Sequence, residues 1–163
     1  MTPAPRAKLK IDVLVDSDRW NEPAKARSIV RRAVAQAAAT ASTTGTELAI
    51  VLTDDSAIRQ LNRLWRGIDA ATNVLSFPSK QTTDEPSHLG DIVLAYETIA
   101  REATAEGKPF AHHLAHLTVH GFLHLIGYDH ETDAEAERME ALETRILTRL
   151  GVGDPNAREV VGG

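Results

Sequence analysis

Residues 110–130 read FAHHLAHLTVHGFLHLIGYDH and contain six of the seven histidines in the chain. Up to residue 126 the stretch has the length and composition of a helix that is apolar around most of its circumference, so we expect it at the centre of the molecule. An imidazole buried without a partner is costly. Several histidines on one buried helix therefore need a shared reason, and a bound metal ion is the simplest one.

The histidine spacing predicts where such an ion would bind. His120 and His124 are four residues apart, which places both rings on one helical face. Gly127 can end the helix in a left-handed conformation and reverse the chain, so that His130 returns to the same ion. Three imidazoles with one free position are typical of catalytic zinc, although nickel or copper would also suit them. The alternative, core histidines bonded to carbonyls, suits one histidine better than three.

The remaining histidines on this helix have less specific interpretations. His116 lies one turn before His120 and could hydrogen-bond a metal ligand or a substrate phosphate. A packing or surface role is an equal alternative for it. We expect His112 and His113, at the start of the helix, to be solvated.

The spacing is also that of the metzincin proteases, but Gly121 replaces the glutamate that serves as their general base. Peptide hydrolysis by that mechanism lacks its base. A metal ion can still lower the pKa of water to about 7 or act as a Lewis acid on a phosphoryl oxygen. Asp129 and Glu131 flank His130 and are alternative bases, although each equally suits a solvated residue or a cap.

Hydrophobic periodicity and turn residues predict a single α plus β domain over residues 1–151, with a loose tail at 152–163. Strands are predicted at residues 9–15, 46–53, 74–77 and 89–95. Helices are predicted at residues 23–41, 55–65, 96–106, 110–126 and 133–150, with Thr132 as the cap of the last helix and Gly151 as its stop. A surface loop is expected at residues 82–87.

Composition excludes several classes of protein. The 163 residues include no cysteine, which rules out disulfide partners, thiolate zinc sites, iron–sulfur clusters and a thiol nucleophile. No apolar run approaches the roughly 18–20 residues of a membrane span. We therefore expect a cytoplasmic protein without a membrane partner, whose metal ligands are histidine, aspartate or glutamate.

The net charge of −5 is an average of two unlike halves. Residues 1–66 hold 11 Lys or Arg and 7 Asp or Glu, whereas residues 67–163 hold 7 and 16. The acidic total therefore does not exclude RNA, and the uneven distribution predicts a localised, salt-sensitive footprint on one face. The arginines that could line one side of a cleft are Arg27, Arg31, Arg32, Arg59, Arg63 and Arg66.

A second polar constellation precedes the third predicted strand. Arg66 offers a planar fork suited to two phosphate oxygens. From the residues alone a surface arginine is the preferred interpretation, and Asp69, Thr72 and Asn73 are preferred as turn formers.

Together the two constellations resemble the YbeY family of metal-dependent endoribonucleases, bacterial factors in ribosomal RNA maturation. The resemblance covers roughly residues 45–150 in the family's order and spacing. Its motifs are Leu61-Asn62, Trp65-Arg66 and Asp69, the run TNVLSFP at 72–78, LGDIV at 89–93, AHLTVHGFLHLIGYDH at 115–130, and Glu135, Glu137 and Met139-Glu140.

The resemblance implies an α+β fold in which a small mixed four-stranded sheet packs with about five helices around a zincin-like site. His120, His124 and His130 would bind one zinc ion, and Arg66 would be the required arginine beside it. Trp65 stands where Tyr or Phe is common, and Asn73 where Asp is frequent, which puts a carboxylate role there in doubt.

The implied activity is cleavage of single-stranded RNA in maturation of the 3′ end of small-subunit ribosomal RNA and in ribosome quality control. Ribosomal RNA, small-subunit ribosomal proteins and assembly factors are the implied partners. Two rival functions stay open: a zinc peptidase or other metallohydrolase, and a ribosome assembly factor without catalysis.

Overall fold

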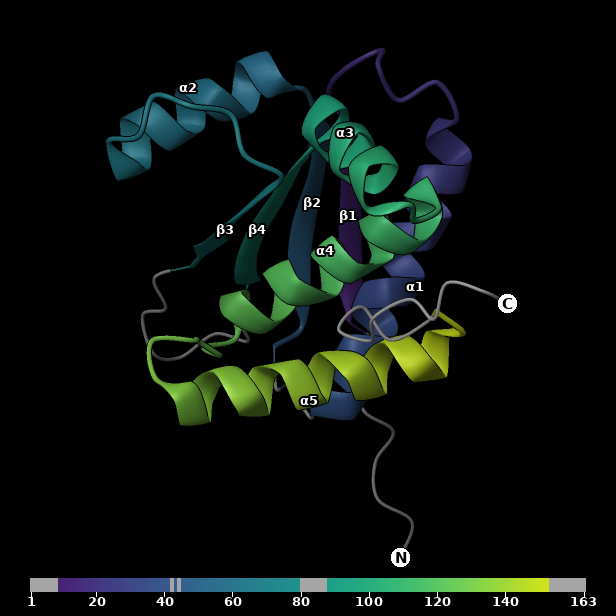
Figure 1. Ribbon diagram of the computed structural model, residues 1–163, viewed down its shortest axis with the longest axis vertical. Coiled ribbons are helices and arrows are strands. Elements are labelled where there is room, and N and C mark those ends of the chain that lie inside the picture. The colour runs from purple at the N-terminus through teal and green to yellow at the C-terminus, as the bar shows by residue number, and fades with distance from the viewer. Residues whose placement is uncertain (1–8, 42, 44, 80–87, 153–163) are drawn as a thin grey trace, which may run out of the picture.

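The computed structural model describes residues 9–41, 43, 45–79 and 88–152 (Figure 1). All four predicted strands and all five predicted helices are present, with bounds that differ by no more than one residue. The loop expected at 82–87 and residues 153–163 of the expected tail lie outside the described residues. In chain order the elements are β1 (Lys10–Val15), α1 (Pro23–Ala41), β2 (Glu47–Thr53), α2 (Asp55–Arg66), β3 (Val74–Pro78), β4 (His88–Ala95), α3 (Tyr96–Glu106), α4 (Phe110–Leu125) and α5 (Asp133–Leu150).

The strands form one mixed sheet in the order β1-β2-β4-β3. β1, β2 and β4 are parallel, whereas β3 runs antiparallel to β4 at the edge, with Ser76 opposite Ile92. The mixed four-stranded sheet implied by the resemblance is therefore confirmed.

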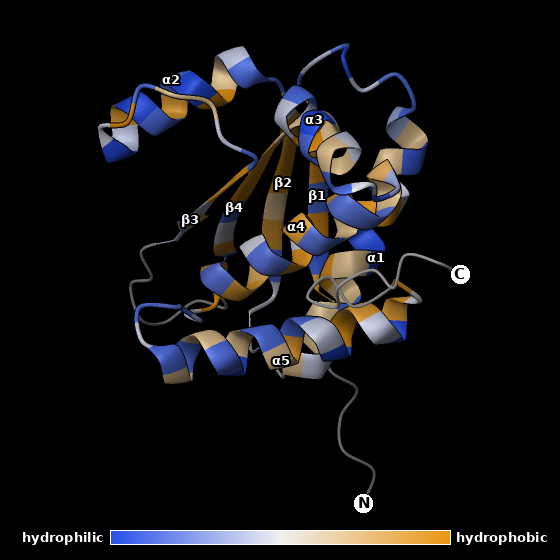
Figure 2. Cartoon of the chain, in the orientation of Figure 1, coloured by the Kyte–Doolittle hydropathy of each residue, from blue (hydrophilic) through white to orange (hydrophobic). Residues whose placement is uncertain are grey.

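The main core lies between one face of the sheet and helices α1 and α4, and α5 packs across both helices (Figure 1). The strands are largely apolar, although β1 and β4 include polar residues, whereas the helices carry polar residues on their outer faces (Figure 2). α4 is buried by the sheet on one side and by α5 on another, with Leu114, Val119 and Phe122 fully buried. The expectation of a central histidine-bearing helix is confirmed. Among the described helices, none is long and apolar enough to cross a membrane.

α2 lies on the opposite face of the sheet, where Ile58 is buried with Leu75 and Val93. Asp54 begins this helix, because its side chain accepts a hydrogen bond from the backbone N–H of Ala57. Near the end of α2, Trp65 is 67% exposed and meets the ring of Phe77 on the edge strand at a centroid distance of 6.3 Å. α2 therefore ends at β3, which places Arg66 beside the edge of the sheet.

Candidate metal centre

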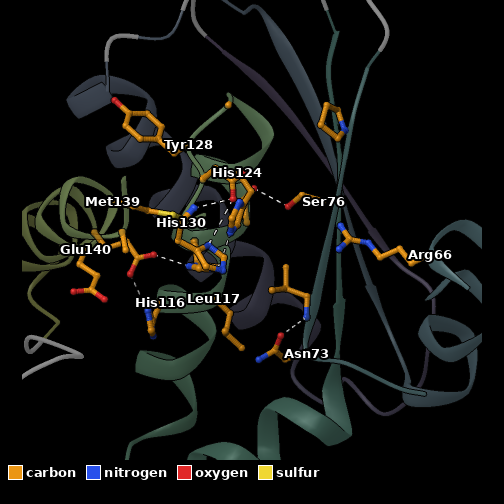
Figure 3. Close-up of a pocket in the computed structure, with 18 residues that line it drawn as sticks. Arg66, Asn73, Ser76, His116, Leu117, His124, Tyr128, His130, Met139 and Glu140 are labelled. Atoms are coloured by element: carbon orange, nitrogen blue, oxygen red, sulfur yellow. Dashed lines mark hydrogen bonds and ion pairs between the residues drawn. The ribbon is translucent and has the colours of Figure 1, made fainter. Parts of the chain in front are cut away.

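A cleft of about 820 Å³ brings the predicted site residues together. His120 and His124 of α4 line it with His130 from the turn that follows, and Arg66 lines it from the end of α2. β3 and α5 supply further walls. Figure 3 shows the guanidinium end of Arg66 turned toward the histidine cluster from the opposite side. Residues from two distant parts of the sequence thus share one open cavity.

Two histidines of the helix already have the separation that a shared ion requires. The Nε2 atoms of His120 and His124 lie 3.1 Å apart. Two nitrogens at zinc-ligand distance in a tetrahedral site are about 3.3 Å apart. The spacing of these two nitrogens therefore fits a divalent transition-metal ion, such as zinc, between the two rings.

Glu143 of α5 fixes the ring of His120. Its Oε1 lies 2.6 Å from His120 Nδ1, and its side chain is only 6% exposed. Burial by itself raises the pKa of this carboxyl, but hydrogen bonds from His116 and His120 outweigh burial and lower the pKa to about 2. The charged carboxylate accepts a hydrogen bond from Nδ1–H, which leaves Nε2 of His120 free to bind a metal ion.

The turn after α4 brings the third histidine to the cleft. Gly127 has φ +104°, and its N–H donates to the carbonyl of His124 while the N–H of Tyr128 donates to that of Leu123. The predicted role of Gly127 in reversing the chain is confirmed. The ring of His130 then lies 5.1 Å from that of His124, measured between centroids. Its side chain is 59% exposed, so this side of the cluster is open to solvent.

Asp129 not only precedes His130 in the sequence but also lies close to the histidine cluster. One donor atom each from His124, Asp129 and His130 fall within 4.8 Å of one another. Asp129 also accepts the backbone N–H of His130 at 2.7 Å. The carboxylate is therefore a possible fourth ligand or a group that holds water, whereas Glu131 is not among the residues that line the cleft.

The environment of His124 favours the neutral imidazole. Burial lowers the pKa of this histidine, and the neighbouring rings of His120 and His130 lower it further. Neutral imidazole is the form that binds metal ions. The cluster therefore stabilises a ligand-competent state of its central member.

Packing explains the glycine that replaces the metzincin glutamate. A Cβ atom on Gly121 would lie 3.0 Å from Val74 Cγ2 and 3.2 Å from Ser76 Oγ. The carbonyl of Gly121 also accepts a hydrogen bond from Ser76 at 2.7 Å. Because α4 approaches the sheet so closely here, a larger side chain would require the side chains of Val74, Ser76 and Ile92 to shift.

The expectation that six arginines line one side of a cleft is wrong for five of them. Of the six, only Arg66 lines the cleft. Arg59 instead pairs with Asp69 at 2.8 Å. Arg27, Arg31 and Arg32 lie on α1, whose main contacts are with β1, α4 and α5. The sequence order of basic residues does not show which of them the fold brings together.

The helix start differs in part from the sequence prediction. His112 is exposed as expected, but His113 is 4% exposed because α3 packs beside it. Its Nε2 lies 3.0 Å from Glu102, which also accepts a hydrogen bond from the Asn73 amide at 2.9 Å. Asn73 therefore joins the cleft wall to a buried histidine, and an aspartate in its place would face the charge of Glu102.

Sequence reasoning missed Glu143. The signal was present, since Glu143 is four residues after Met139 and three before Ile146, on the buried face of the last helix. A glutamate at a core-facing position needs a polar partner. Which partner it meets depends on where α5 crosses α4, and the sequence does not give that crossing.

This chain is similar to proteins of one family. The family Endoribonuclease YbeY matches residues 14–151. Endoribonuclease YbeY of Bradyrhizobium sp. (strain BTAi1) is 57% identical over 154 residues, covering 90% of this chain and 91% of its own length. The Rhodopseudomonas palustris (strain BisB18) protein of that name is 58% identical, with coverage of 90% and 91%. For the Nitrobacter hamburgensis protein the identity is 60%, with coverage of 90% and 81%.

Among solved structures, the solution structure of TM1509 from Thermotoga maritima is 23% identical and covers 91% of this chain and 99% of its own length, with a TM-score of 0.48. The family match spans nearly all of the described residues, from β1 to the end of α5. The three relatives are identical to this chain at more than half of the aligned positions. The chain therefore belongs to the endoribonuclease YbeY family.

Proposed function

We propose that this chain cleaves single-stranded RNA in maturation of the 3′ end of small-subunit ribosomal RNA and in ribosome quality control, with one zinc ion held by His120, His124 and His130. Family membership supports a metal-dependent endoribonuclease. The observation that carries the site is the pair of Nε2 atoms of His120 and His124, 3.1 Å apart in a cleft that Arg66 lines from the other side.

The residues of the cleft would have different roles in hydrolysis. Zinc held by the three histidines would supply a Lewis acid that polarises a phosphoryl oxygen and makes an attacking water more acidic. Arg66 presents a planar guanidinium that binds phosphoryl oxygens and offsets the negative charge of the transition state. Asp129 would orient the water, and its closeness to His124 and His130 supports that role.

Neither Glu143 nor position 121 supplies a dedicated general base. Glu143 is buried and already paired with two histidines, and even a Cβ atom at position 121 would crowd the side chains of Val74, Ile92 and Ser76. We expect the intrinsic activity to be low. Small-subunit ribosomal proteins or assembly factors would then raise the rate by presenting the RNA.

A substrate panel tests the function. Zinc-loaded wild-type protein should cleave unstructured RNA oligonucleotides faster than the same sequences in duplexes, and a chelator should abolish cleavage. Peptides should be left intact. Cleavage of peptides but not of RNA by the same preparation would instead establish the peptidase.

The rival without catalysis needs a test in cells. If the metal only stabilises the cleft, a folded His124→Ala variant that has lost its metal should still restore ribosomal RNA processing in cells lacking the gene. We expect no restoration. His112→Ala is the matched control, because it removes an exposed histidine from the same helix.

A further inference from the structure

Glu143 is a charged residue in an apolar setting. Its side chain is 6% exposed, and its neighbours on the buried face of α5 are Met139, Ile146 and Leu147, none more than 2% exposed. Burial of a carboxylate is strongly unfavourable unless it is paired and hydrogen-bonded. A leucine at this position would avoid that cost, so the glutamate needs a reason that its own helix does not supply.

The partners of Glu143 are two histidines of α4, one turn apart. Oε1 lies 2.6 Å from Nδ1 of His120, and Oε2 lies 3.3 Å from Nε2 of His116. A carboxylate can only accept, so each ring donates an N–H to it. For His120 this places the proton on Nδ1 and turns the other nitrogen toward His124, 3.1 Å away.

His116 offers the cleft no nitrogen that is both unpaired and exposed. Its Nε2 is engaged with Glu143, and its Nδ1 is buried without a hydrogen-bond partner among the described residues. His116 therefore acts on the site only through the carboxylate. It occupies the second oxygen of Glu143 and restricts the rotation of that side chain.

We propose that Glu143 is a positioning residue that fixes the orientation and tautomer of His120, and that His116 holds Glu143 in place. This inference rests on the proposed function in that it takes His120 as a metal ligand. Carboxylates that bind the second nitrogen of a ligating histidine orient its ring, and their loss costs about 10- to 100-fold in metal affinity. Glu143 binds the second nitrogen of His120 in this way, and His116 binds the other carboxylate oxygen. These two contacts link α5 to the cleft.

A Glu143→Leu variant distinguishes a positioning role of Glu143 from a purely structural one. Leucine suits the apolar neighbours of Glu143, so the variant should fold and resist unfolding at neutral pH as well as wild type does. Its zinc affinity, measured by competition with a chromophoric chelator, should fall about 10- to 100-fold. Glu143→Gln keeps an oxygen acceptor and should lose less, and His116→Ala should lose less than Glu143→Leu.

A metal-independent measurement tests the same proposal. At a pH above the ordinary histidine pKa of about 6.5, NMR of the metal-free protein should find the His120 proton on Nδ1 in wild type. In Glu143→Leu the proton should redistribute between the two nitrogens. Glu140→Leu is the matched control, because Glu140 lines the cleft from the same helix but bonds no histidine among the described residues.

The outcomes distinguish the proposal from the function on which it rests. If Glu143→Leu folds and binds zinc as tightly as wild type, with the His120 proton unmoved, the positioning role is wrong and the endoribonuclease stands. If Glu143→Leu unfolds readily and Glu143→Gln retains full zinc affinity, Glu143 is structural and the proposal is overturned. If His124→Ala leaves zinc binding unchanged, the metal site itself is wrong and the positioning role falls with it.

Discussion

The two ends of the histidine cluster are built differently. At the helical end, His120 is 30% exposed and bonded to a buried carboxylate on another helix. At the turn end, His130 is 59% exposed, Asp129 is 49% exposed, and the bond between them is local in sequence. The helical end is held by tertiary packing, whereas the turn end depends on the conformation of four residues after α4.

This difference indicates how the site is assembled. The helical end is formed by the same core that folds the protein, so its geometry costs no further ordering when an ion binds. The turn end has fewer contacts, and binding must order it. An open turn also leaves room for an RNA strand beside the ion, which a closed four-ligand structural site would not. Variants that affect one end alone should reveal the division.

The largest effect is expected from His124, which lies between the two ends. His124→Ala should reduce zinc affinity more than 100-fold, beyond the range for residues that only support a ligand. His130→Ala should lose less, because Asp129 is close enough to replace it. Isothermal titration with zinc, using His112→Ala as control, measures both. Equal losses would show that the two ends are equally important.

Acid should weaken the helical end first through Glu143. Its pKa falls from 4.5 to about 2 on folding, so the unfolded chain binds more protons between those values. The resulting stabilisation, roughly 3 kcal/mol, is present above pH 4.5 and is lost as the pH falls toward 2. Urea unfolding of metal-free protein should show this loss in wild type and not in Glu143→Leu. Parallel pH profiles for the two proteins would contradict it.

Gly127→Ala should damage the turn end alone. A side chain at φ +104° is strained by about 1–2 kcal/mol, although a Cβ there would meet nothing within 4 Å. Both stability and zinc affinity should fall, because His130 is displaced. Gly151→Ala is the matched control, since φ is +79° there and the residue ends α5 away from the cleft. It should lose the same stability and keep its zinc affinity.

The smallest effect is expected from Asp129→Asn. The substitution removes the charge but keeps an oxygen for the backbone N–H of His130, so zinc affinity should fall only a few-fold and thermal stability should not change. Glu131→Gln, which changes an exposed acid outside the cleft, should change neither. A loss as large as that of His124→Ala would instead make Asp129 a principal ligand.

The sequence was sufficient for local features and insufficient for crossings between elements. Hydrophobic periodicity, the cap at Thr132 and the glycines at 127 and 151 predicted the helices and strands, because these signals act within a few residues. The histidine spacing within one helix brought His120 and His124 together for the same reason. Burial of His113 could not be predicted, because it depends on how α3 packs against α4.

Arg66 shows the limit from the other side. The resemblance implied Arg66 as the required arginine, but from the residues alone a surface role was preferred for it. Only the fold shows that α2 ends at the edge strand and that Arg66 lines the cleft. Glu143 was hidden for a similar reason, since only the crossing of α5 over α4 puts its carboxylate beside His120. Tertiary packing brings both residues to the site, and a pattern within a few residues of sequence does not determine that packing.

The most direct test is the rate of RNA cleavage measured together with zinc content in Arg66→Ala. Arg63→Ala is the control, because it removes an exposed arginine from the same helix that does not line the cleft. We predict that Arg66→Ala binds one zinc per chain and cleaves single-stranded RNA about 100-fold more slowly, while Arg63→Ala matches wild type. Loss of zinc from Arg66→Ala, or unchanged cleavage by it, would contradict the role of Arg66 and the two-sided cleft.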